Sequence, residues 1–111
     1  MTLSNQEVIN ILNVFDDIAS KDLPVSLAFD LYTVHSKLME VYSSYIKALD
    51  RRMKKEGVEN PGELSEESGI NELLAREVEI DAPPIKKSTL IESECKFSLS
   101  QIYALKPIID G

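Results

Sequence analysis

The side chains that most often carry out chemistry in proteins are sparse in this chain. Its single histidine, His35, has no His or Cys three or four residues away, the spacing at which one helix presents two ligands to a metal. Its single cysteine, Cys95, lies between Glu94 and Lys96, so a base that activates the thiol would have to come from elsewhere, as His35 could if the fold brought it near. We expect His35 to be an ordinary helix residue and Cys95 not to be a nucleophile.

Three carboxylates alternate along one short segment. Glu77, Glu79 and Asp81 would lie on the same face of a strand, and carboxylates are the ligands that hard cations prefer. No glycine-punctuated loop orders them as in an EF-hand, so we expect a solvent-exposed strand face. With only four glycines, the chain also has no phosphate-binding loop. The sequence therefore predicts no catalytic, cofactor-binding or metal-binding residue, and a protein that is not an enzyme.

A basic cluster is followed directly by an acidic segment. The cluster consists of Arg51, Arg52, Lys54 and Lys55, whereas residues 59–81 hold eight carboxylates and one arginine. The cluster could contact nucleic acid or another anionic partner, or it could pair with the acidic segment. The tether and the opposite charge favour pairing within the chain, and a net charge of −7 argues against nucleic acid as a partner.

The element that must position these residues is a long helix over residues 24–56. Pro24 suits a first turn, Gly57 suits the position after the last turn, and nothing between them breaks a helix. Such a rod is about 50 Å long, whereas a compact domain of about 100 residues has a radius of gyration of about 13 Å. Its apolar seam has the near-3.5 spacing of a coiled coil. The seam consists of Leu31, Val34, Leu38, Val41, Tyr45 and Leu49.

A shorter helix over residues 5–19 precedes it and makes an αα-hairpin. Ser4 and Glu7 form a capping box at its start. One face is apolar at helical spacing. This face consists of Val8, Ile11, Leu12, Phe15 and Ile18. We expect Phe15 and Ile18 to pack against Leu27 and Leu31 of the long helix.

The rest of the chain predicts smaller elements. After the hairpin of residues 1–57 come an acidic loop, residues 58–69, and a small α+β unit, residues 70–111. That unit should hold a short helix over residues 70–76, a strand over 77–81, a possible second strand within 85–90, and a last helix capped by Ser98 with a break at Pro107. The predicted fold class is mostly α, in a single domain.

The far half of the long helix is left without cover by this arrangement. The first helix is about 24 Å long and shields only the near half. A contiguous apolar stripe in water is uncommon on a monomer. We expect residues 70–111 to cover part of the stripe and a second protomer to cover the rest. The predicted partner-binding residues are Val41, Tyr45, Leu49 and Met53, together with Arg51 and Arg52.

Parts of the sequence resemble a family of small tailed-bacteriophage proteins recorded as a domain of unknown function. The resembling stretches are residues 3–57, 71–81 and 98–110, roughly two-thirds of the chain. The most telling elements are Leu23-Pro24-Val25 at the start of the long helix and the Glu-Leu-Leu and Glu-Val-Glu-Ile-Asp runs of residues 72–81. The resemblance implies a phage or prophage origin and no assigned activity.

Together these features predict a non-enzymatic phage interaction protein. The first hypothesis is a structural or assembly component that acts through the long helix in a homo-oligomer. The alternative is a phage-encoded inhibitor or regulator, of the anti-defence type, that binds a bacterial host protein. With one cysteine, no leader-like start and no run of 18 apolar residues, we expect no membrane partner and a location in the host-cell cytoplasm or in a virion assembled there.

Overall fold

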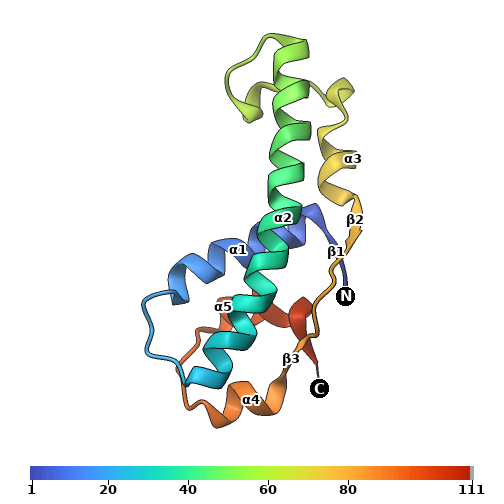
Figure 1. The fold of residues 1–111 in the computed structure, drawn as a ribbon. Helices are drawn as coiled ribbons and strands as arrows, with labels where there is room; N and C mark the ends of the chain where they lie inside the picture. Colours follow the sequence, from blue (N-terminus) through green and yellow to red (C-terminus); the bar gives the residue numbers. More distant parts are fainter. Residues whose placement is uncertain (111) are drawn as a thin grey trace.

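Two helices form the expected hairpin (Figure 1). The structure is a computed structural model that describes residues 1–110, and the chain is 67% helical. Helix α1 spans Asn5–Ile18 and helix α2 spans Val25–Glu56. The 32 residues of α2 make a rod of about 48 Å, and the longest extent of the molecule is 49 Å. One helix therefore sets the length of the whole protein.

The ends of both helices follow from local hydrogen bonds. Ser4 Oγ accepts from the Glu7 amide at 3.1 Å, and the Glu7 carboxylate accepts from the Ser4 amide at 2.9 Å, which confirms the capping box. At the end of α2, Gly57 adopts φ +69° and its amide donates to the Lys54 carbonyl. A side chain would be strained at this φ, so glycine is the residue that ends the helix here.

Helix α1 lies at the centre of the hydrophobic core. It packs against α2 on one side and against α5, Leu99–Leu105, on another. Phe15, Ile18, Leu27 and Leu31 all belong to one buried cluster, as predicted. Because α1 is covered from two sides, its buried face is wider than one stripe and also includes Val14.

The first residues form a strand that the sequence pattern did not predict. β1, Thr2–Ser4, pairs antiparallel with β2, Glu77–Glu79, with Leu3 opposite Val78. Leu3 is buried in the core cluster, and the Asn5 amide donates to the Arg76 carbonyl at 3.0 Å. The pairing fastens the start of α1 to a segment about 70 residues further along the chain.

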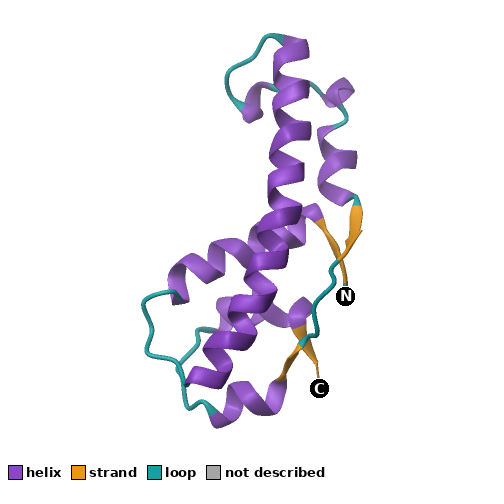
Figure 2. Cartoon of the chain, viewed as in Figure 1, coloured by secondary structure: helices purple, strands orange, loops and turns teal. Residues whose placement is uncertain are grey.

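The remaining elements are short (Figure 2). Helix α3 spans Ile70–Ala75, strand β3 spans Ile85–Lys86, helix α4 spans Lys87–Glu92 and strand β4 spans Ile109–Asp110. Strand β3 pairs in parallel with β4. The acidic loop of residues 58–69 contains two 3-10 turns, Pro61–Glu63 and Glu66–Ser68, and a third, Lys106–Ile108, follows α5 at Pro107.

Two details of the predicted C-terminal unit need correction. The possible strand within residues 85–90 ends at Lys86, because α4 begins at the next residue and buries Leu90. The unit is also divided in space. Figure 1 shows α3 beside the far half of α2, whereas β3, α4 and α5 lie near its beginning. Residues 81–84, which include two prolines, connect the two parts outside any helix or strand.

Replacing Phe15 with alanine is expected to lower the free energy of unfolding by about 3–5 kcal/mol, because it removes a ring from the packed core. Phe15 is only 8% exposed. Thermal unfolding followed by circular dichroism measures the change. The matched control is Tyr103→Ala, since Tyr103 is 69% exposed on α5 and should alter the melting temperature by about one or two degrees at most. A Phe15→Ala protein that melts like the control would show that Phe15 is not a core residue.

Candidate functional site

The far half of α2 receives a partial cover from its own chain. Leu49 is 7% exposed, and α3, with the equally buried Leu73, packs against α2. The Arg52 guanidinium fixes this cover, because its Nε donates to the Ser68 carbonyl at 3.0 Å and its Nη1 to the Ala48 carbonyl at 3.1 Å. Of the predicted partner-binding residues, Leu49 is therefore an interior residue and Arg52 is engaged within the chain.

The other residues of the predicted stripe stay partly accessible. Val41, Tyr45 and Met53 are half-buried, and Arg51 is exposed. Val41 and Tyr45 line a groove of about 530 Å³ between α2 and the α3–β2 segment. Their contact with a partner remains a prediction.

Tyr45 is the titratable group most affected by this groove. Burial raises its pKa above the ordinary value of 10.0, and Tyr42 raises it further. The two rings stack with centroids 6.2 Å apart. The Tyr45 hydroxyl therefore stays protonated at neutral pH.

The basic cluster does not pair with the acidic segment in the way that we expected. Within residues 1–110 its ion pair is Lys54 with Asp50, one turn away on α2 at 2.9 Å. The bond of Arg52 to the segment goes to a backbone carbonyl, that of Ser68. Glu56 holds the loop instead, accepting from the Ser65 amide at 3.0 Å and from Ser65 Oγ at 2.7 Å. The loop is thus fastened to α2 by hydrogen bonds in both directions, since Arg52 donates to it and Glu56 accepts from it.

The alternating carboxylates are exposed, and Glu79 supports the β1–β2 pairing. Glu79 accepts from Thr2 Oγ1 at 2.7 Å and lies 3.2 Å from the amino group of Met1. The hydrogen bond from Thr2, followed by that from the amino group, lowers the pKa of Glu79. Glu77 is exposed at the other end of β2, and Asp81 lies beyond the strand. Across residues 1–110, no group of three or more His, Cys, Asp or Glu side chains could hold a metal ion.

His35 and Cys95 both have structural partners. The His35 ring meets Phe15 edge-on, with centroids 5.1 Å apart. Cys95 Sγ lies 3.6 Å from the Asp22 carbonyl, which links the segment before α5 to the loop between α1 and α2. These contacts give both residues a role in packing.

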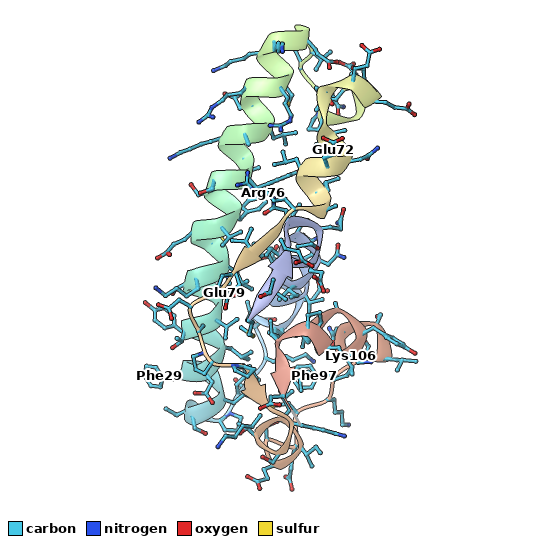
Figure 3. All side chains as sticks on the ribbon, turned by 90° about the vertical axis from the view of Figure 1, so that its right-hand side faces the viewer. Phe29, Glu72, Arg76, Glu79, Phe97 and Lys106 are labelled. Atoms are coloured by element: carbon cyan, nitrogen blue, oxygen red, sulfur yellow. The ribbon has the colours of Figure 1, made fainter. Side chains whose placement is uncertain are left out.

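The most exposed apolar surface of α2 is on its outer face, which sequence reasoning missed. Phe29 and Leu31 are two residues apart and so differ by about 200° around the helix axis. Leu31 is buried, whereas Phe29 is 66% exposed and points away from the rest of the molecule (Figure 3). We call five exposed residues on this side the outer stripe. The outer stripe consists of Val25, Phe29, Tyr32, Met39 and Ile46.

The signal for the outer stripe was present in the sequence. Its members follow one another at intervals of four, three, seven and seven residues, which is a heptad spacing. The buried seam has the same spacing, so the two stripes run side by side along different faces of one helix. We assigned the buried seam to the core and did not consider the outer stripe.

A second apolar surface lies at the C-terminal end of the chain. A groove of about 520 Å³ between α4 and α5 is lined by Leu90, Ile91, Cys95, Phe97, Ile102 and Ile109, with Lys87 and Lys106 as its charged residues. Figure 3 shows Phe97 and Lys106 on the same side of the molecule. Ile91 is 66% exposed, and the neighbouring helix α5 exposes Leu99 and Tyr103. The groove therefore offers apolar contacts beside positive charge.

No family model, curated protein or solved structure matches the chain. Among the helices of residues 1–110, none combines the length and the apolar character needed to cross a membrane. The candidate functional site is therefore defined by its own chemistry. It is an exposed apolar face on a long helix.

The bond between Glu56 and Ser65 gives a pH prediction. The Ser65 amide and then its hydroxyl lower the pKa of Glu56 below the ordinary value of 4.5. The stabilisation from this contact is therefore complete above pH 4.5 and is lost as the pH falls through the lower, folded-state pKa. In an NMR titration, the Ser65 amide resonance should move with a midpoint below 4.5. Glu56→Gln should abolish the movement, and a midpoint at or above 4.5 would contradict the contact.

Proposed function

We propose that this chain is a non-enzymatic interaction protein of a tailed phage or prophage, acting as a structural or assembly component that self-associates through α2. One observation carries the proposal. The large exposed apolar residues of α2 recur at heptad spacing along one side of the helix, from Val25 to Ile46. Exposed apolar residues that are scattered singly need no explanation, whereas a regular line of them on one helix is the pattern of an interaction surface.

The composition of the outer stripe supports binding. Phe29 and Tyr32 are aromatic and Met39 is a flexible apolar residue, and these types are enriched at protein interfaces. Aromatic side chains bury about 150–250 Å² each when they are covered. Two rings one turn apart on a rigid helix thus make a compact anchor. The half-buried groove at Val41 and Tyr45, with Met53 and Arg51 beyond it, is a second contact region on the same helix.

The elongated shape supports a structural role. The molecule measures 49 × 24 × 20 Å, and its radius of gyration of 15.8 Å exceeds the value of about 13 Å for a compact chain of this size. A rod with apolar surface along its length can join copies or hold other components at a fixed spacing. In this role the chain would act in the host-cell cytoplasm or within a virion.

Light scattering of the purified chain at tens of micromolar tests self-association. We expect the mass of a dimer or larger assembly for the wild type, and a monomer for Phe29→Glu and for Tyr32→Glu, because a charge would have to be buried at the contact. The matched control is Tyr103→Glu, which places the same charge at an equally exposed aromatic residue of α5 and should leave the mass unchanged.

Two outcomes would contradict this prediction. A clean monomer mass for the wild type would rule out self-association at these concentrations. An assembly that survives Phe29→Glu and Tyr32→Glu but dissociates in Tyr45→Glu would move the contact to the groove between α2 and α3, as the sequence first predicted.

The groove between α4 and α5 favours the alternative function. Its apolar lining and its two lysines complement an acidic, apolar segment of another protein. A phage-encoded inhibitor or regulator could bind a bacterial host protein there. The location of the chain separates the two functions, because an assembly component of the particle is found in purified virions, whereas an inhibitor is found only in the lysate of infected cells.

A further inference from the structure

We infer that two copies of this chain pair antiparallel along the outer face of α2, with Phe29 of each copy opposite Ile46 of the other. The inference rests on the proposed self-association and adds to it the partner surface, the direction and the register. It follows from the order of side-chain sizes along the outer face.

The outer face contains two columns of residues. One column holds the large side chains Val25, Tyr32, Met39 and Ile46, spaced by seven. The other holds Phe29 and then the smaller Ser36, Ser43 and Asp50, also spaced by seven. The two columns alternate at intervals of four and three, which is the arrangement of core positions in a coiled coil.

A parallel pair in register would place identical residues against each other. Asp50 would then face Asp50 of the second copy in the contact, so two like charges would meet, each compensated only by Lys54 of its own helix. Ser36 and Ser43 would likewise face their own copies and leave space between the helices. The outer face is therefore poorly suited to parallel pairing.

An antiparallel pair at one register avoids both the contact between like charges and the space between facing serines. When Phe29 lies opposite Ile46 of the second copy, Tyr32 lies opposite Ser43 and Met39 lies opposite Ser36. Each of these layers occurs twice, because the pair has two-fold symmetry. Large side chains then meet small ones, which lets the two helices interdigitate closely.

Antiparallel registers shifted by one heptad bring together side chains that fit less well. A shift of one heptad in one direction brings Glu40 of both copies together and places Asp50 opposite Tyr32. The opposite shift places Ile46 beyond the start of the other α2, opposite Asp22 in the loop. In the inferred register, Glu40 lies beside Thr33 and Lys47 beside Ser26, so like charges do not meet along the edges.

The start of α2 supports this register independently. The helix begins after Pro24 with no side-chain hydrogen bond to its first amides and no acidic residue in its first turn. These amides carry the positive end of the helix dipole. In the inferred pair, Asp50 of the second copy lies opposite Val25, so a carboxylate is brought to this uncapped end. In Figure 3 the labelled side chain of Phe29, near this end of α2, points away from the rest of the ribbon.

Disulfide formation between single-cysteine variants tests the direction and the register. Both variants carry Cys95→Ser, and they contain either Tyr32→Cys or Ser43→Cys. In the inferred pair each new cysteine is 11 residues, or about 16 Å, from its own copy but directly opposite the other variant's cysteine. Under mild oxidation we expect a covalent dimer when the two variants are mixed, and none when either variant is oxidised alone. Distinct tags on the two variants identify the mixed product by mass.

The result separates failure of the register from failure of the proposed function. If the unmodified chain is monomeric in light scattering, both the proposed function and this inference are wrong. If it associates but Ser43→Cys crosslinks to itself, the pairing is parallel and the inferred register is overturned. If it associates and neither variant crosslinks, alone or mixed, the contact lies elsewhere on the chain and the inference is also overturned.

Discussion

The burial of α1 against α2 is the interaction on which the rest of the structure depends. Helix α1 has 14 residues and α2 has 32, so α1 can cover only part of its partner. The near half of α2 and the opposite side of α1 form one continuous core with α5, Leu3 and the residues around β3 and β4. The far half needs a different cover, and the chain provides it by returning along α2 as α3 and β2. The length difference between the two helices thus explains why α3 and β2 return along the far half of α2.

Helix α2 has two apolar stripes with different roles. The inner stripe, which is the seam from Leu31 to Leu49, packs against α1 along the near half of α2. Along the far half α3 covers it only partly, and Arg52 and Glu56 hold the returning segment there by hydrogen bonds. The outer stripe is exposed, and serines separate its larger side chains. Two of its members, Tyr32 and Met39, also border hollows beside α1. A helix that is apolar on both sides is normally buried on both sides, which favours a second protein as the cover of the outer stripe.

Several polar groups of the molecule hold separate segments together. Buried Asn5 donates to the Leu73 carbonyl at 2.8 Å and so joins α1 to α3. In residues 1–110, no buried polar side-chain atom lacks a hydrogen-bond partner. The groups with lowered pKa, Glu56 and Glu79, are exposed and fasten a loop and a strand.

The sequence by itself determined the features that depend on residues within about four positions of one another. Ser4 with Glu7, Ser98 with Gln101 and the positive φ of Gly57 start or end helices through local hydrogen bonds, and the helical spacing gave the seam and the buried face of α1. Tertiary structure decided the rest. The pairing of β1 with β2 joins Leu3 to Val78, 75 positions away, and although the alternation of residues 77–81 predicted a strand, nothing in it named the first residues of the chain as its partner. The tertiary structure also decided that Leu49 is interior, because α3 packs against the far half of α2. The outer stripe stays exposed because α1 and α3 pack on the seam that contains Leu31 and Leu49.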